Sequence, residues 1–420
     1  MPFTIHKDRR KTGMKRYSFS RLPSDFRGLA LCVLCGASMS LLVPGLASAG
    51  WVSQTSGTNE PLFSVYFPLD TSTGYAVGYS GTILKTTNGG ANWLSQTSGT
   101  FHTLMSVHFP VDAATGYAVG GDVGVSTILK TTDGGANWDT LRSGTTNYLW
   151  SVHFLVDAST GYAVGWYGTI LKTTNGGANW LPQISGTTNY LFSVYFPVDA
   201  LTGYVVGWGG AILKTTNGGA NWVSQTSGTT NIFNSVHFPM NVQTGYSVGV
   251  YGTILKTTNG GATWDSLTSG TINNLFSVYF PVDSLTGYVV GYAGTILKTT
   301  NGGTVWVSQT SSTTNRLNSV HFPLDAQTGY AVGNNGTILK TMDGGSGVEE
   351  TAGVRGQGLG IRVTAKPNPF TSFATLPGHE AERFSLYDIS GRKVGTYRGD
   401  RIGEGLSAGV YFIKIGRAHV

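Results

Sequence analysis

A 42-residue phrase recurs seven times between Leu62 and Gly345, and this repeat constrains the fold more than any other feature of the chain. One copy, from Leu191 to Trp222, contains Leu-Phe-Ser-Val-Tyr-Phe-Pro-Val-Asp, then Gly-Tyr-Val-Val-Gly, then Ile-Leu-Lys-Thr-Thr-Asn-Gly-Gly-Ala-Asn-Trp. A fixed period of this length indicates an array of identical supersecondary units. Residues that recur in every copy are therefore interpreted first as architecture.

Each copy contains four short runs that are rich in β-branched and aromatic residues and are bounded by Gly, Pro, Asn or Asp. In the first copy these runs are 62–67, 74–78, 82–87 and 93–98. No part of the array has a helical period of useful length. Four strands in about 42 residues are typical of one blade of a β-propeller.

The tryptophan that ends each phrase gives the number of blades. Successive tryptophans are 42 residues apart, except for one interval of 45: they are Trp51, Trp93, Trp138, Trp180, Trp222, Trp264 and Trp306. The last copy lacks its fourth run, whereas the chain has an unpaired fourth run at 51–56. Circular closure by this N-terminal strand leaves no open sheet edge. The sequence therefore predicts an all-β fold, with a seven-bladed β-propeller over residues 50–345 closed by the N-terminal strand.

The turn before each tryptophan, as in Lys85 to Trp93, resembles the Asp-box, Ser/Thr-x-Asp-x-Gly-x-x-Trp. Its physical role is local, because an Asx side chain bonds nearby N–H groups and the glycines take positive φ. The lysine of each copy is expected to stabilise the hairpin or to face solvent. The predicted structural Asp-box residues are Asn88, Trp93, Asp133, Trp138, Asn175, Trp180, Asn217, Trp222, Asn259, Trp264, Asn301, Trp306 and Asp343.

With the Gly-Tyr-Ala-Val-Gly and Gly-Thr-Ile-Leu-Lys phrases, the array resembles the photosystem II stability/assembly-factor-like propeller family over about residues 51–345. This resemblance implies the fold. It does not imply a photosystem role, because the likeness lies in the blade residues and one fold serves many functions.

Residues 1–49 have the pattern of a signal peptide. Basic residues precede an apolar stretch at 29–46, and Ala47-Ser48-Ala49 fits a cleavage site before Gly50. The apolar stretch is too short and too broken for a membrane span, so no transmembrane segment is expected in the mature chain. The start of translation, Met1 or Met14, stays open.

The signal segment also accounts for the charge and the cysteines of the chain. It carries a net charge of +6, which is the net charge of all 420 residues, so no basic surface remains for nucleic acid. Both cysteines, Cys32 and Cys35, lie in it, so the mature chain has no disulfide.

Three phrases near the C-terminus, 366–370, 384–394 and 406–414, resemble a type IX secretion C-terminal sorting domain, a small β-sandwich. The resemblance implies type IX secretion machinery as a partner and a protein that is secreted or held on the outer cell surface. Residues 346–360 are predicted to be a linker and 361–420 the sorting domain. The final residues, 415–420, read like translated adapter sequence, so the domain is expected to be truncated.

Catalytic constellations are weak in the repeats. Sialidases also carry Asp-boxes, but their chemistry needs three arginines, and the propeller has only Arg142 and Arg316 with one glutamate, Glu60. Most aspartates share one position after the first run and are interpreted as turn residues: Asp70, Asp112, Asp157, Asp199, Asp283 and Asp325, with Asn241 in the remaining copy. The sequence predicts no catalytic residue. The alternative is a secreted glycoside-active enzyme with an unrecognised carboxylate pair.

One position of the first run alternates between histidine and tyrosine: His108, His153, His237 and His321 against Tyr66, Tyr195 and Tyr279. Tyrosine is a poor zinc ligand, so this position is interpreted as packing, and neither a metal nor a cofactor is expected.

Function is sought where the copies differ. Two loop sets are expected to share one face: the turn between the second and third runs, and the connection from the fourth run to the next copy. The first set is the predicted ligand-binding rim and carries Tyr79, Trp166, Tyr167, Trp208, Tyr251 and Tyr292. The second set carries Phe101, His102, Tyr148, Tyr190, Phe233 and Arg316.

Exposed aromatics on such a rim would suit stacking on sugars or anchoring of a protein, and the alternative is that they cover adjacent blades. The chain is therefore interpreted as an exported, non-enzymatic recognition module for a glycan or a surface protein.

Overall fold

The computed structural model describes residues 50–155, 158–345, 383–388, 393–398 and 411–414. The chain divides into two compact units, and the first, Gly45–Glu350, contains the propeller. The predicted signal peptide and linker lie outside the described residues. Within the described residues, no helix is long and apolar enough to cross a membrane.

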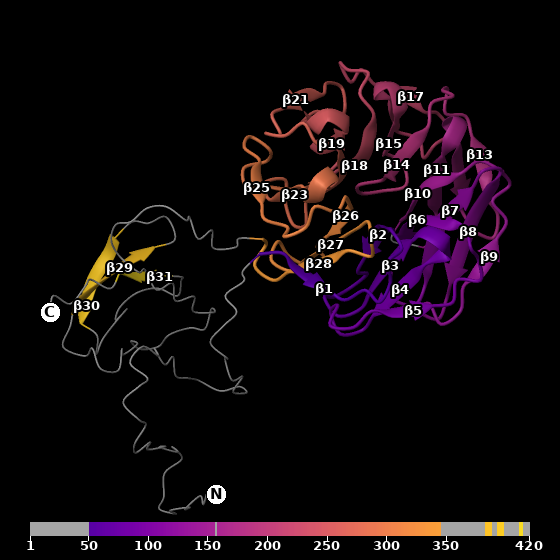
Figure 1. The fold of residues 1–420 in the computed structure, drawn as a ribbon. Coiled ribbons are helices and arrows are strands. Elements are labelled where there is room, and N and C mark those ends of the chain that lie inside the picture. The colour runs from indigo at the N-terminus through magenta and orange to yellow at the C-terminus, as the bar shows by residue number, and fades with distance from the viewer. Residues whose placement is uncertain (1–49, 156–157, 346–382, 389–392, 399–410, 415–420) are drawn as a thin grey trace, which may run out of the picture. The chain divides into compact units, whose positions relative to one another are not determined.

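Seven four-stranded antiparallel sheets form the blades of the propeller (Figure 1). Blade one contains β2 (Leu62–Tyr66), β3 (Gly74–Gly78), β4 (Ile83–Thr86) and β5 (Leu94–Gln96). Blade two contains β6 (Thr103–His108), β7 (Gly116–Asp122), β8 (Val125–Thr131) and β9 (Asp139–Leu141). Blade three contains β10 (Leu149–Phe154), β11 (Gly161–Gly165), β12 (Ile170–Thr173) and β13 (Leu181–Gln183). Blade four contains β14 (Leu191–Tyr195), β15 (Gly203–Gly207), β16 (Ile212–Thr215) and β17 (Val223–Ser224).

The remaining blades repeat this order. Blade five contains β18 (Phe233–His237), β19 (Gly245–Gly249), β20 (Ile254–Thr257) and β21 (Asp265–Leu267). Blade six contains β22 (Leu275–Tyr279), β23 (Gly287–Gly291), β24 (Ile296–Thr299) and β25 (Val307–Gln309). Blade seven contains β26 (Leu317–His321), β27 (Gly329–Gly333), β28 (Ile338–Thr341) and β1 (Val52–Gln54).

The N-terminal strand closes the ring. β1 pairs antiparallel with β28, with Val52 opposite Lys340 and Gln54 opposite Ile338. In Figure 1 the indigo β1 lies beside the orange β28. The predicted closure and the predicted seven blades are therefore confirmed.

The first strands of the blades line the centre of the ring, and those of neighbouring blades contact each other. Each first strand has a register shift before the serine of its phrase, as between Leu62 and Ser64 in β2 and between Leu104 and Ser106 in β6. In five blades a short 3-10 turn joins the second strand to the third: η1 (Tyr79–Gly81), η2 (Trp166–Gly168), η3 (Trp208–Gly210), η4 (Val250–Gly252) and η5 (Tyr292–Gly294).

The apolar core lies between blades, with one buried cluster at each of the seven interfaces. At the interface of blades seven and one, Phe67 stacks on Tyr330 with 3.9 Å between ring centroids, and Trp93 packs edge-on against Phe67. Gly74 faces the same ring, and a Cβ at this position would collide with it. Because both faces of each sheet are covered, all five residues of β3 are buried.

Hydrogen bonds join the blades at equivalent positions. Ser64 Oγ accepts the Val107 N–H of the next blade at 3.3 Å, and the equivalent bond recurs at every interface. Lys85 Nζ donates to Gly134 O of the next blade's Asp-box turn at 2.7 Å, and this bond also recurs throughout. The sequence-based expectation that each lysine stabilises its own hairpin or faces solvent is therefore wrong. The lysines join neighbouring blades.

The alternating histidines and tyrosines form a closed ring around the channel. Neighbouring rings are 4.7–5.0 Å apart between centroids. His321 Nδ1 accepts the Phe67 N–H at 3.4 Å, whereas His153 Nε2 lies 3.2 Å from Phe196 O and donates to it. Burial lowers the pKa of His153 to about 4, and the pKa of His237 and His321 to about 3. These contacts agree with the packing interpretation.

The second unit includes a three-stranded antiparallel sheet in the order β30-β29-β31, formed by β29 (Arg383–Asp388), β30 (Lys393–Arg398) and β31 (Tyr411–Lys414). The rest of the predicted sandwich lies outside the described residues.

We predict that Lys340→Met destabilises the propeller by about 1–2 kcal/mol. The change keeps an apolar side chain but removes a charge-assisted bond to Gly89 O at 2.7 Å, which leaves a buried carbonyl with one partner fewer. Chemical denaturation of the full chain measures this, with the exposed Arg142→Met as the control, expected to change stability by less than about 0.5 kcal/mol. Equal effects of the two changes would contradict an inter-blade role for the lysine.

We also predict that acid weakens the propeller through its histidine ring. The folded pKa values lie below the unfolded value of about 6.5, so below that pH the unfolded state binds more protons. Stability is complete above about pH 6.5 and falls as the pH drops towards the folded values, by about 1.4 kcal/mol per pH unit for each histidine. In His237→Asn/His321→Asn the slope of unfolding free energy against pH, from 6.5 to 4.5, should be shallower. Equal slopes in the variant and the natural protein would contradict a role of the histidine ring in acid sensitivity.

Candidate recognition face

Two loop sets meet on one face of the propeller. The Trp166 N–H donates to Tyr148 O in the connection that enters blade three, at 2.9 Å. The Gly168 N–H donates to Asn189 O in the connection that enters blade four, also at 2.9 Å. The turn between the second and third strands is thus bonded to the connections on both sides, so the two loop sets share one face, as predicted.

The predicted rim residues are exposed, with one exception. Tyr79, Tyr167, Trp208, Tyr251 and Tyr292 each expose more than half of their surface. This exposure favours the rim interpretation over the alternative that these side chains are buried against adjacent blades. Trp166 is half-buried, because other aromatic rings cover both of its faces.

An aromatic cluster surrounds Trp166, formed by Tyr148, Trp166, Tyr167, Tyr190 and Trp208. Trp166 lies between Tyr148 and Tyr190, with centroids 5.2 and 5.3 Å away and nearly parallel planes. Tyr190 contacts Tyr167 at 5.3 Å and Trp208 at 6.0 Å, both edge-on. Burial raises the pKa of Tyr148 to about 12. Within the described residues, Tyr251 and Tyr292 make no ring contact with this cluster, and Tyr79 interacts with it only electrostatically, through Tyr148. Three of the six predicted rim residues, Trp166, Tyr167 and Trp208, are therefore in ring contact with the cluster.

Two of the rim tyrosines have unfavourable backbone conformations. Tyr167 and Tyr251 occupy the left-handed region, with φ of 54° and 55°. Ser80, Ala293 and Asn335 take the same conformation at this position in other blades, and blade four has Gly209 there. A bulky residue there costs about 1–2 kcal/mol. Tyr251 exposes 73% of its surface, so packing does not offset that strain.

The mouth of the central channel lies beside the aromatic cluster. A cavity of about 100 Å³ is lined by the second residue of every first-strand phrase together with Arg316: Phe63, Met105, Trp150, Phe192, Asn234, Phe276 and Asn318. Trp150 contacts Tyr148 at 5.6 Å and Phe192 at 4.9 Å, so the cluster continues into the channel mouth.

Of the residues that line this cavity, only Arg316 was predicted from the sequence, as part of the second loop set. The available signal for the others was that their shared position differs between copies inside an otherwise constant phrase.

The second predicted loop set is only partly correct. Phe101 exposes 90% of its surface, and His102 Nδ1 pairs with Thr127 Oγ1 at 2.8 Å. Phe233 is fully buried, which contradicts its assignment to the rim. It begins β18 and takes the place of the leucine that begins most of the other first strands.

The repeated acids act as turn residues. Asp70 Oδ1 accepts the N–H groups of Ser72 and Thr73, each at 2.9 Å, and these bonds lower the pKa of Asp70. The same pattern recurs at Asp112, Asp199, Asn241, Asp283 and Asp325. Asp157 lies outside the described residues.

The Asp-box residues have the predicted local role. Asn88 Oδ1 accepts the Thr86 hydroxyl at 3.0 Å and the Asn92 N–H at 2.9 Å, and Trp93 is buried. Equivalent bonds recur at Asp133, Asn175, Asn217, Asn259 and Asn301, and Asp343 accepts the Thr341 hydroxyl.

Among the described residues, the acids outside the repeated positions do not form a carboxylate pair. Asp139 and Asp265 are exposed first residues of outer strands, in blades two and five, which are not neighbours. Among the described residues, no group of three or more His, Cys, Asp or Glu side chains could hold a metal ion.

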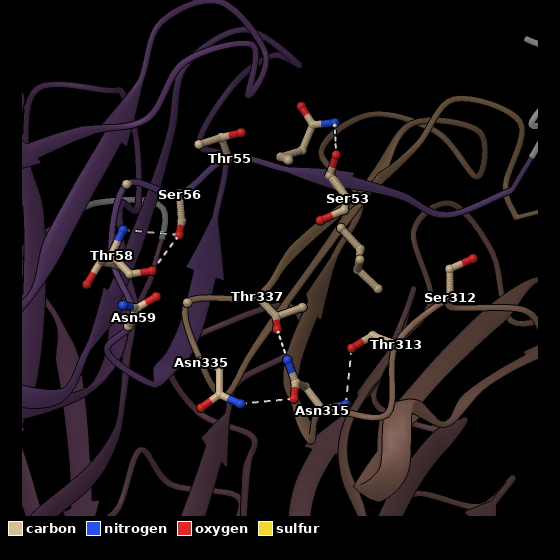
Figure 2. Close-up of a pocket in the computed structure, with 14 residues that line it drawn as sticks. Ser53, Thr55, Ser56, Thr58, Asn59, Ser312, Thr313, Asn315, Asn335 and Thr337 are labelled. Atoms are coloured by element: carbon tan, nitrogen blue, oxygen red, sulfur yellow. Dashed lines mark hydrogen bonds between the residues drawn. The ribbon is translucent and has the colours of Figure 1, made fainter.

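A polar groove of about 470 Å³ lies where the N-terminal strand meets blade seven (Figure 2). Hydroxyl and amide groups line it, but many are already bonded to each other. Asn335 Nδ2 donates to Asn315 Oδ1 at 3.0 Å, and Asn315 Nδ2 donates to Thr337 Oγ1 at 2.8 Å. Blade seven has asparagines where blade three has Trp166 and Tyr167, so the groove lacks aromatic rings for stacking.

Comparison with known proteins places the chain in a family. The sequence model described as photosynthesis system II assembly factor YCF48 matches five overlapping segments: 43–142, 140–226, 183–272, 225–309 and 270–350. No curated protein sequence matches the chain.

Among solved structures, YCF48 from Cyanidioschyzon merolae is similar, with a TM-score of 0.59 and 20% sequence identity over 70% of this chain and 98% of that chain. A structure described as YCF48 bound to D1 peptide is also similar, with a TM-score of 0.59 and 18% identity over 71% of this chain and 99% of that chain. Because the family's sequence model spans residues 43–350, the chain belongs to the YCF48-like family of photosystem II assembly factors.

Proposed function

We propose that this protein is a non-enzymatic recognition module that binds a protein partner through its aromatic cluster. The observation that carries the proposal is the half-buried Trp166 between Tyr148 and Tyr190, with Tyr167 and Trp208 exposed beside it. A rigid aromatic patch of this kind anchors partners with little loss of conformational entropy.

A protein partner is favoured over a glycan for two reasons. One structurally similar YCF48 is described as bound to the D1 peptide, so a propeller of this fold binds a peptide. The hydroxyl- and amide-lined groove that would suit a sugar has no aromatic side chain in its lining. A glycan ligand stays the alternative.

The setting of this function is also a proposal. The basic and apolar pattern of residues 1–49 and the three C-terminal phrases support export by a signal peptide, followed by type IX secretion to the cell surface or medium. A partner outside the cell fits these segments.

Replacement of Trp166 and Tyr167 by asparagine tests the rim. Blade seven carries Asn334-Asn335 at these positions in the same turn, so the fold accommodates the change. Peptides are first selected from a display library for binding to the full natural chain. Their affinity for the Trp166→Asn/Tyr167→Asn variant should be about thirtyfold lower, a loss of about 2 kcal/mol or more of binding free energy.

The matched control is Val198→Asn/Leu201→Asn. These exposed apolar residues lie in the β14–β15 loop, at the opposite end of the blade, and their replacement should leave peptide affinity unchanged. Loss of binding in the control but not in the rim variant would overturn the proposal. Binding on a glycan array without any peptide binding would favour the glycan alternative instead.

Export is tested separately in a bacterium with type IX secretion. We expect the exported protein to begin at Gly50 and to reach the cell surface or medium, whereas deletion of 361–420 should leave it in the periplasm. N-terminal sequencing and cell fractionation measure both outcomes. An intact N-terminus in the cytoplasm would contradict the signal, and secretion of the deleted chain would contradict the sorting domain.

A further inference from the structure

The channel mouth contains polar groups that have no partner. Arg316 Nε, Trp150 Nε1 and Asn318 Oδ1 are all buried without a hydrogen bond in the described part of the chain. Asn318 is 8% exposed, and its Nδ2 donates to Leu62 O at 2.8 Å and to Asn334 Oδ1 at 3.3 Å, whereas its oxygen has no partner among the described residues. Buried polar groups are rarely left unpaired. The indole N–H groups of the seven repeated tryptophans are unpaired in this part of the chain as well, so Trp150 alone indicates little. Arg316 and Asn318 lie outside that repeated set and line one cavity, and together they indicate a missing ligand.

The charge of Arg316 is also uncompensated. Its guanidinium carbon lies 3.7 Å from the centroid of the Phe276 ring, and burial lowers its pKa with no acid contributing. Glu60 lies in the connection that enters blade one and Asp122 ends β7 on the same face, but among the described residues neither forms an ion pair with Arg316. Stacking covers the face of a guanidinium and leaves its N–H edge free, which is the edge that binds a carboxylate in two places.

We propose that the channel mouth is a binding site for a carboxylate group at the end of a partner peptide. Arg316 pairs with the carboxylate, the Trp150 indole N–H donates a second bond, and Asn318 Oδ1 accepts the backbone N–H of the same residue. A peptide terminus supplies both an anion and a nearby donor. That the carboxylate belongs to a protein partner rests on the proposed function. The carboxylate site itself rests on the unpaired groups of Arg316, Trp150 and Asn318.

The size of the cavity supports this class of ligand. Its volume of about 100 Å³ is well below that of sites for drug-sized molecules, about 300–1,000 Å³, so it admits a chain end or a side-chain tip. Trp150 and Phe192 form an apolar wall for the residue that carries the carboxylate, and Trp150 joins this wall to the aromatic cluster through Tyr148.

Three short probes test the site on the full chain: N-acetyl-Gly-Gly-Phe with a free carboxylate, the same peptide as its C-terminal amide, and N-acetyl-Gly-Asp-Gly-amide. The readout is the NMR signal of the Trp150 indole N–H, assigned with Trp150→Phe. The free acid should shift this signal and bind at least about tenfold more tightly than the amide. If the aspartate probe binds as tightly as the acid, the carboxylate site stands and its source is an acidic side chain.

Arg316→Gln should abolish the preference for the acid, and Arg142→Gln should keep it. Arg142 is the other arginine of the propeller and is exposed, so this control makes the same chemical change away from the channel. Arg316→Lys retains the charge but loses the planar fork, and it should retain a weakened preference, which answers the question if the glutamine variant does not fold. Equal binding of acid and amide, or an Arg316→Gln variant that still prefers the acid, would overturn the proposal. The rim variants do not enter this test, so failure of the library experiment and failure of this one are separate results.

Discussion

The packing of each blade against its neighbours is the constraint on which the rest of the structure depends. A single blade is apolar on both faces, and β3 is buried along its whole length, so no blade can cover its own core. Each interface combines the same three elements: a stacked pair such as Phe67 and Tyr330, a serine that accepts an N–H from the next blade, and a lysine that reaches the next Asp-box turn. An open array would leave one such set unpaired at each end together with a free strand edge. Closure through β1 removes all of these costs at once.

This division of labour explains why function is confined to a few positions. The repeated residues make the hydrogen bonds of the turns and the contacts between blades. In a closed ring each blade needs the same contacts on both sides, which constrains these residues. Because consecutive copies are neighbours in space, differing residues in adjacent copies can meet. The aromatic cluster arises in this way: Trp166 and Tyr167 come from blade three, and Tyr190 comes from the connection that enters blade four.

The propeller could be predicted almost completely from the sequence, and the site only in part. The spacing from Trp51 to Trp306 determines the blade count and the closure, because both depend only on period and length. The period does not show whether Lys85 bonds within its own blade or to the next blade. Both partners would recur in every copy of the repeat, so the two arrangements give the same sequence pattern. The channel-mouth residues were missed because the register shift after Leu62 breaks the simple alternation of inward and outward side chains. Phe233 was misplaced for a related reason, since an aromatic residue at a strand start resembles one in a loop.

The channel makes Arg316 unusual in electrostatic terms. Beyond the mouth, its lining consists of serines and then of the histidine and tyrosine ring, whose histidines are kept neutral at pH 7 by burial. No carboxylate belongs to these rings, so nothing along the lining offsets the guanidinium charge. In a site of reduced dielectric such a charge acts over a longer distance than it would in water. The field at the mouth therefore favours an anion, and the aromatic path from Trp166 through Tyr148 to Trp150 leads to that point. Apolar anchoring on the rim and pairing at the mouth would then act on one ligand, with the rim supplying affinity and the single charge fixing which end of the ligand enters.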